Sequence, residues 1–214
     1  MLDLFESTEA GACEALGEQA MVLRGLALPH VPALLAALQE VQSAAPFRHM
    51  VTPGGFTMSV ALTNCGEWGW TSDRHGYRYA REDPQSGQPW PALPEVFRTL
   101  AREAADRAGF AGFVPDACLI NRYVPGARLS LHQDRNERDL IAPVVSVSLG
   151  IPATFLFGGH QRSDKSRRTP LWHGDIAVWG GVDRLRFHGV LPLKPAYHPL
   201  LGEQRINITF RKTR

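Results

Sequence analysis

The sequence predicts an α+β fold whose core is a pair of β-sheets, arranged as a sandwich or jelly roll. The 214 residues include 20 glycines and 16 prolines, which suit short strands and turns better than a helical bundle. Hydrophobic residues make up 44% and charged residues 21%, which is ordinary for a globular protein. After residue 113, short β-type runs follow one another and are separated by tight turns.

Two helices are expected before these strands, where they can cover one face of the double sheet. The first spans 31–43, in which apolar residues recur at helical spacing. The second runs from about Pro94 to Ala108, because proline suits a first helical position and Gly109 suits the residue past the end. The expected strands are 117–124, 128–132, 144–149, 153–157, 175–179, 184–188 and 205–211.

We expect one domain over 1–214, with four parts. These are an N-terminal strand and helix extension (1–50), an aromatic and arginine-rich segment (51–93), a supporting helix (94–110) and the jelly-roll core (114–214). The aromatic segment is predicted to lie as loops and short strands over a site. The alternative is an irregular surface layer that is packed by its own aromatic side chains.

Charge, cysteine content and the N-terminus restrict the partners and the compartment. The net charge is +2, so any contact with nucleic acid must come from a local basic patch. Cys13, Cys65 and Cys118 form no CxxC pair and indicate a reducing compartment. The first residues lack the pattern of a signal peptide, and no apolar run reaches about 18 residues. We therefore expect a cytoplasmic protein without a membrane partner.

The first candidate site combines His132 and Asp134 with His188, which follows 54 residues after the aspartate. Residues i and i+2 of a strand share one face, so the first two side chains can point at one ion. Two imidazoles and one carboxylate are the ligands of non-haem Fe(II) oxygenases, which keep coordination positions open. The alternatives are an ordinary polar turn around residue 132 and a hydrogen-bonded core histidine at 188.

A second His-x-Asp pattern, His173-Gly174-Asp175, has to be weighed against the first. Its central glycine indicates a turn, and its aspartate opens an expected strand. We expect this carboxylate to accept hydrogen bonds from local backbone amides rather than to bind a metal.

The second candidate site is an anion-binding strand. Segment 205–211 alternates strictly, with polar residues Arg205, Asn207, Thr209 and Arg211 on one face. Its two arginine Cα atoms lie about 20 Å apart in an extended strand, and inward-bending side chains leave room for a short dicarboxylate. Asn121 and Tyr123 share a face of 117–124 and can bind the same acid. The alternatives are an edge strand with a solvated polar face, and a polar face of 117–124 turned to water.

Four longer segments add a resemblance to a known family. They are VTPGGFTMSVALTNCG (51–66), GQPWPALP (87–94), NRYVPGARLSLHQD (121–134) and RINITFR (205–211). Together with the His-x-Asp…His pattern, they closely resemble bacterial AlkB-type alkylated-DNA-repair dioxygenases, which use Fe(II) and 2-oxoglutarate. The resemblance runs along nearly the whole chain. It implies a double-stranded β-helix, a jelly roll with helices on one side, and a nucleotide-recognition lid formed by 51–93.

The resemblance also implies roles for individual residues. The iron ligands would be His132, Asp134 and His188. The contacts to 2-oxoglutarate would be Asn121, Tyr123, Arg205, Asn207 and Arg211. The contacts to the nucleotide would be Trp70, Tyr77, Arg78, Tyr79, Asn136 and Arg162. The basic loop 161–168 is expected at the DNA backbone, with a solvated charge run as the alternative.

The implied activity is oxidative demethylation of bases such as 1-methyladenine and 3-methylcytosine in DNA, with RNA as a second candidate. Decarboxylation of 2-oxoglutarate, with dioxygen as the other co-substrate, drives hydroxylation of the methyl group and release of formaldehyde. The target base would leave the stack of a single or double strand and lie between Trp70 and His132. No obligate protein partner is implied.

One position departs from the family pattern. Asn136 stands where the family has an aspartate that is thought to accept from the exocyclic amine of the base. Asparagine offers an acceptor without charge, so we expect a weaker preference for cationic lesions, with Glu137 as a candidate to compensate. Two other functions are alternatives for this sequence: a 2-oxoglutarate oxygenase for a small molecule or protein, and a jelly-roll binding module with a structural zinc.

Overall fold

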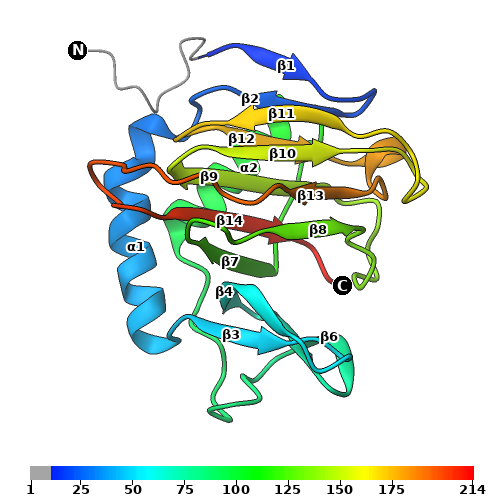
Figure 1. Ribbon diagram of the computed structural model, residues 1–214. Helices are drawn as coiled ribbons and strands as arrows, with labels where there is room; N and C mark the ends of the chain where they lie inside the picture. The colour runs from blue at the N-terminus through cyan, green and yellow to red at the C-terminus, as the bar shows by residue number, and fades with distance from the viewer. Residues whose placement is uncertain (1–10) are drawn as a thin grey trace.

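The computed structural model describes residues 11–214 and confirms the predicted core of two β-sheets with helices on one side (Figure 1). Strands within both sheets pair in an antiparallel manner. Residues 1–10, the first part of the expected N-terminal extension, lie outside the described residues.

The larger sheet has eight strands and the smaller sheet has four. The larger sheet runs in the order β1 (Cys13–Ala15), β2 (Ala20–Leu23), β12 (Ile176–Trp179), β9 (Val144–Gly150), β14 (Arg205–Arg211), β7 (Ala117–Tyr123), β4 (Thr57–Gly66), β3 (Arg48–Val51). The smaller sheet runs in the order β11 (Arg167–Leu171), β10 (Ala153–Phe157), β13 (His188–Val190), β8 (Leu129–His132). A separate hairpin consists of β5 (Gly69–Asp73) and β6 (Gly76–Ala80).

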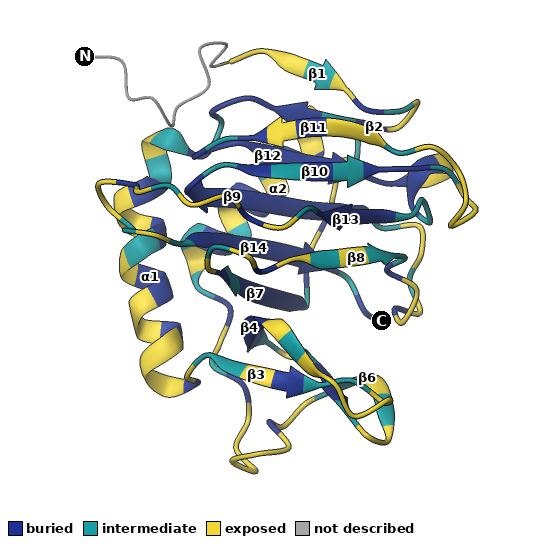
Figure 2. Ribbon diagram, viewed as in Figure 1, coloured by how far each residue is buried: buried dark blue, intermediate teal, exposed yellow. Residues whose placement is uncertain are grey.

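Both predicted helices are present and cover the outer face of the larger sheet. They are α1 (Val31–Ala44) and α2 (Glu95–Arg107), and their apolar faces pack on the sheet in one buried cluster (Figure 2). Pro94 is the capping residue of α2 rather than its first helical residue, because its ψ of 143° is extended. Gly109 has a φ of +87°, the left-handed conformation expected just past a helix end. Within 11–214, no helix has the length and apolar character needed to cross a membrane.

Strand β14 lies in the middle of the larger sheet, so the edge-strand alternative for 205–211 is wrong. It pairs with β9 on one side and β7 on the other, and all seven of its residues are buried. Ile206, Ile208 and Phe210 pack toward the helices. The polar face therefore points into the space between the two sheets, where its side chains are withdrawn from water.

The strand predicted over 184–188 is wrong in its position. The chain first makes a short 3₁₀ turn, η2 (Gly181–Asp183), and the strand begins only at His188. The Asp183 carboxylate fixes this turn by accepting from the backbone of Gln19 (2.7 Å) and from the side chain of Arg186. A second short 3₁₀ turn, η1 (Leu28–His30), precedes α1.

The aromatic segment 51–93 divides into two structural parts. Its first part, β4, joins the larger sheet beside β7. Its second part is the β5–β6 hairpin, which lies beside the sheet at the end where β3 and β4 are found (Figure 1). Asn64 joins the two parts, because its amide exchanges two 3.0 Å hydrogen bonds with the backbone of Trp70.

Candidate metal centre and anion pocket

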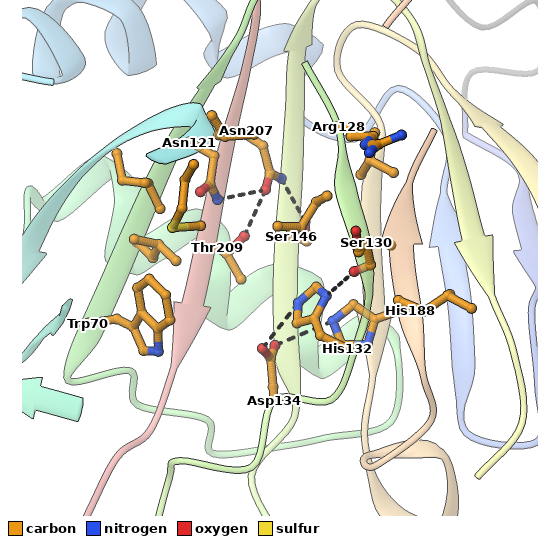
Figure 3. Close-up of a pocket in the computed structure, with 18 of the residues that line it drawn as sticks. Trp70, Asn121, Arg128, Ser130, His132, Asp134, Ser146, His188, Asn207 and Thr209 are labelled. Atoms are coloured by element: carbon orange, nitrogen blue, oxygen red, sulfur yellow. Dashed lines mark hydrogen bonds and ion pairs between the residues drawn. The ribbon is translucent and has the colours of Figure 1, made fainter. Parts of the chain in front are cut away.

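The three predicted metal ligands converge at the mouth of the space between the sheets. His132 ends β8 and His188 begins β13, and these two residues are direct partners in the antiparallel pair. Asp134 follows two residues after His132. One potential ligand atom from each side chain lies within 4.8 Å of the others, and the two imidazole centroids are 4.4 Å apart (Figure 3). This is the only such group among the described residues.

An irregularity in the pairing of β8 with β13, with one extra residue on β8, lies directly beside the His132–His188 pair. The pairing of β13 with β8 shifts its register between His188 and Val190. Gly189 lies at that shift, and a Cβ atom there would be 2.6 Å from the backbone oxygen of Leu129. Glycine is therefore required for the close approach of the two strands.

Both histidines are oriented by their own backbones. The Nδ1 of His132 lies 2.9 Å from the carbonyl oxygen of Ser130, and the Nδ1 of His188 lies 3.0 Å from that of Arg186. Donation from Nδ1 to these carbonyls leaves both Nε2 atoms as free electron-pair donors toward Asp134. Desolvation, and then the neighbouring His188, lower the pKa of His132 to about 4. His132 is therefore neutral at pH 7, which is the form that binds metal ions.

Asp134 is held as a carboxylate by Arg211. The guanidinium donates from Nε (2.9 Å) and Nη2 (2.8 Å) to Oδ2 of Asp134. Burial alone would raise the pKa of Asp134, but Arg211 and then the two histidines hold it well below its ordinary value. Two neutral imidazoles and one ionised carboxylate fit an Fe(II) ion and occupy only one side of it.

Arg205 forms an anion pocket beside the metal centre. Its side chain is 2% exposed, and Nη2 donates to Ser148 Oγ (2.9 Å). Nε and Nη1 have no hydrogen-bond partner among the described residues, and no carboxylate there compensates the charge. A buried guanidinium without a counter-ion is costly. The pocket therefore fits a carboxylate, which can accept from the planar fork of arginine donors.

The other predicted co-substrate residues line the same cavity, which has a volume of about 850 Å³. Asn207 is fixed by Ser146 Oγ (2.7 Å) and by the Val147 backbone (3.0 Å), and its oxygen accepts from Asn121 (3.3 Å). The ring of Tyr123 lies with its centroid 5.0 Å from the Arg205 guanidinium carbon. The structure thus brings together Asn121, Tyr123, Arg205, Asn207 and Arg211, and their contacts with a co-substrate remain predictions.

The predicted nucleotide contacts divide into two groups. Four of them line the cavity: Trp70, Tyr77, Asn136 and Arg162. Trp70 lies across the cavity from His132 and His188 in Figure 3, and its ring stacks on Tyr77 at 5.5 Å. Arg78 and Tyr79 are not among the lining residues. Arg78 pairs with Asp73 on its own hairpin (2.9 and 2.6 Å), and Tyr79 donates to Glu137 (2.5 Å).

The basic side chains of segment 161–168 lie in three different settings: in an ion pair, exposed to solvent, and at the cavity. Arg167 pairs with Glu14 (2.5 Å), whereas Lys165 and Arg168 are exposed. Arg162 turns to the cavity, with its guanidinium carbon 5.0 Å from the ring centroid of Phe187. Two further cations line the cavity and were not predicted: Arg128 and Arg135 are both exposed there.

The second His-x-Asp pattern is a turn, as predicted. Asp175 is fully buried and accepts from the backbone of Trp172 (2.9 Å) and Gly25 (2.9 Å) and from the side chain of Arg24 (2.5 Å). Gly174 has a φ of +86°. This aspartate therefore fixes the chain that follows β2 to the start of β12 and is not part of the metal centre.

Comparison with known proteins agrees with this geometry. Residues 19–211 match the family described as the 2OG-Fe(II) oxygenase superfamily. The alpha-ketoglutarate-dependent dioxygenase AlkB of Salmonella typhimurium is 59% identical over 99% of this chain and 98% of its own. The solved structure of OsALKBH1 superposes with a TM-score of 0.81, at 28% identity, over 94% of this chain and all of that one.

More distant relatives carry names that state a substrate. A DNA N(6)-methyladenine demethylase of Arabidopsis thaliana, ALKBH1C, is 32% identical over 63% of this chain and 35% of its own. The tRNA demethylase abh1 of Schizosaccharomyces pombe is 27% identical over 69% of this chain and 50% of its own. From the matched family, the full-length similarity to AlkB and the metal centre beside an anion pocket, we conclude that the chain belongs to the 2OG-Fe(II) oxygenase superfamily and is an AlkB-type alpha-ketoglutarate-dependent dioxygenase.

Proposed function

We propose that this dioxygenase removes methyl groups from the ring nitrogens of damaged nucleobases in DNA, with RNA as a second substrate. The observation that carries the proposal is the arrangement of one cavity. The metal centre and the anion pocket line it together with Trp70 and Tyr77 of the β5–β6 hairpin and with exposed arginines. The names of the plant DNA demethylase and the yeast tRNA demethylase support a nucleic-acid substrate.

The protein would hold its cofactor and co-substrate as follows. His132, Asp134 and His188 would bind Fe(II), and Arg205 would bind the distal carboxylate of 2-oxoglutarate, assisted by the amides and Tyr123 beside it. Bound iron would activate dioxygen, the oxidant of the reaction: one oxygen atom would enter succinate as 2-oxoglutarate loses carbon dioxide, and the other would enter the methyl C–H bond, after which formaldehyde leaves.

The outer part of the cavity would receive the base. A methyl group on a ring nitrogen that pairs in a duplex is hidden, so the base must leave the stack, and a lesion that cannot pair makes this easier. Trp70 offers an aromatic face across the cavity from His132 (Figure 3). The exposed Arg128, Arg135 and Arg162 can lie along the phosphates.

A methylated oligonucleotide tests this function directly. We expect formaldehyde and succinate from single-stranded DNA that contains 3-methylcytosine, in the presence of Fe(II) and 2-oxoglutarate. Trp70→Ala is expected to lower turnover at limiting substrate about tenfold, because stacking contributes roughly 1–3 kcal/mol per base. Turnover confined to free methylated nucleosides would instead favour a small-molecule oxygenase, and a complete absence of succinate would favour a binding module.

The lesion preference provides a second test, at Asn136. This side chain is exposed and lines the cavity, so it can meet the bound base. Asn136→Asp adds a negative charge, and we expect it to raise turnover of cationic 3-methylcytosine relative to neutral 3-methylthymine by several-fold, on the order of 1 kcal/mol. The two oligonucleotides are compared in one formaldehyde assay for both proteins. An unchanged ratio would show that position 136 does not determine this preference.

A further inference from the structure

Four charged side chains, one of them the predicted metal ligand Asp134, are buried together at the metal centre. Two are carboxylates, Asp134 and Glu137, and two are guanidiniums, Arg184 and Arg211. The side chains of Glu137 and Arg184 are each only 2% exposed. Glu137 is not among the residues that line the cavity, although its neighbour Asn136 is. Glu137 is therefore placed to act through other residues rather than on the base.

Glu137 contacts three different parts of the fold. Its Oε1 accepts a 2.5 Å hydrogen bond from the hydroxyl of Tyr79, which lies on β6 of the aromatic hairpin. Its Oε2 accepts from Nη2 of Arg184 (3.3 Å), which follows the turn η2. Its Oε1 also lies 3.5 Å from Nε of Arg211 on β14. One carboxylate thus joins the hairpin to both buried guanidiniums.

Both guanidiniums also hold the loop that carries the metal-binding carboxylate. Arg184 donates to the backbone oxygens of Asp134 (2.7 Å) and Ala142 (3.0 Å), and so fixes two ends of this loop. Arg211 donates twice to the side chain of Asp134. The direction of the Asp134 carboxylate is therefore set by two arginines that share Glu137 as a partner.

We propose that Glu137 is a positioning residue which couples docking of the β5–β6 hairpin to metal binding by Asp134. A docked hairpin fixes Glu137 through the Tyr79 hydroxyl, and Glu137 then fixes the arginines that aim Asp134 at the two histidines. Residues behind metal ligands commonly tune metal affinity in this way. The inference rests on the proposed metal site and on the hairpin as the substrate surface.

Such coupling must act in both directions. If a docked hairpin improves metal binding, then metal binding must stabilise the docked hairpin by the same factor. Tyr79→Phe tests this with the smallest change, since it deletes one hydroxyl and leaves the ring in place. Tyr77→Phe is the matched control for metal affinity: it makes the same deletion on the same strand, at a ring that stacks on Trp70, whereas the hydrogen bond to Glu137 comes from Tyr79.

The measurement is titration of the full chain with Mn²⁺, combined with hydrogen exchange of the 69–80 amides with and without Mn²⁺. We expect Tyr79→Phe to weaken Mn²⁺ binding about fivefold, while Tyr77→Phe leaves it at the wild-type value. We expect Mn²⁺ to slow exchange in 69–80 in the wild type and in Tyr77→Phe, and to have little effect on it in Tyr79→Phe. The exchange result separates coupling from a general loss of stability.

Two results would overturn the inference. One is a Mn²⁺ affinity of Tyr79→Phe equal to that of the wild type. The other is equal protection of the 69–80 amides by Mn²⁺ in Tyr79→Phe and in the wild type. Neither result would affect the proposed function, which depends on formaldehyde release by the wild type. If His132→Ala bound Mn²⁺ as tightly as the wild type, the assigned metal site itself would be wrong, and the proposed function would fail together with the inference.

Discussion

Arg205→Met is expected to raise the concentration of 2-oxoglutarate needed for half-maximal turnover about a hundredfold or more. In the structure, this buried guanidinium has two nitrogens without partners and no compensating carboxylate. Loss of a buried, charge-assisted pair costs about 3 kcal/mol, which corresponds to about a hundredfold in affinity. The check is succinate formation as a function of 2-oxoglutarate concentration.

Two further variants make this prediction specific. Arg205→Lys keeps the charge but loses the planar fork, so we expect an intermediate value. Arg122→Met makes the same replacement on β7 at a side chain that stacks on Phe47, outside the cavity, and is expected to leave the dependence unchanged. Because Arg205 has no counter-ion, Arg205→Met should unfold at the same or a higher urea concentration. If Arg205→Met kept the wild-type dependence on 2-oxoglutarate, Arg205 would be excluded as the anchor.

Asp134→Ala is expected to abolish formaldehyde release and also to destabilise the metal-free protein by about 3 kcal/mol. The aspartate is both a proposed metal ligand and the principal ion-pair partner of the buried Arg211. His188→Ala removes a proposed metal ligand but no counter-ion. It should abolish activity as completely with a smaller loss of stability. Urea unfolding of the metal-free proteins and the formaldehyde assay distinguish the two effects.

The dependence of folding stability on pH tests whether the ionised Asp134 carboxylate stabilises the fold. Its folded pKa lies well below its ordinary value, because Arg211 and the histidines favour the carboxylate. The ion pair therefore stabilises the fold fully above the unfolded pKa, about 3.9, and its contribution is lost as the pH falls through the folded pKa. We expect the wild type to exceed Asp134→Ala in stability at pH 7 and the difference to shrink below pH 4. Equal stability at pH 7 would contradict this account of the pair.

Periodic sequence patterns correctly predicted the strands and helices that bury one regular face against the core. The alternation of 205–211 separated its helix-facing residues from its cavity-facing residues, and the helical spacing of 31–43 matched α1. Strand β11 was missed because its arginines and the preceding basic run are typical of a loop. Its pairing with β10 is a long-range contact that a local pattern does not encode. The strand at 188 was misplaced because the Asp183 turn depends on the distant Gln19.

The candidate site divides in the same way. Residue types with a strong chemical signature, such as His132, Asp134 and Arg205, were predicted from the sequence and lie together in the structure. Buried residues that hold the site residues in place were not predicted. Arg184 resembles any surface arginine in the sequence, and Ser148 resembles any strand serine, yet the first fixes the Asp134 loop and the second holds Arg205. Only the packing of distant segments gives these residues their roles.

Anaerobic absorption spectroscopy tests the central claim most directly, because it reports whether one site holds iron and 2-oxoglutarate together. The account predicts a weak visible charge-transfer band when both Fe(II) and 2-oxoglutarate are added to the wild type, and no band with either alone. His132→Ala and His188→Ala should abolish the band, and Arg205→Met should shift its formation to about a hundredfold higher 2-oxoglutarate. A band of undiminished intensity in either histidine variant would contradict the assignment of these side chains to a single metal centre.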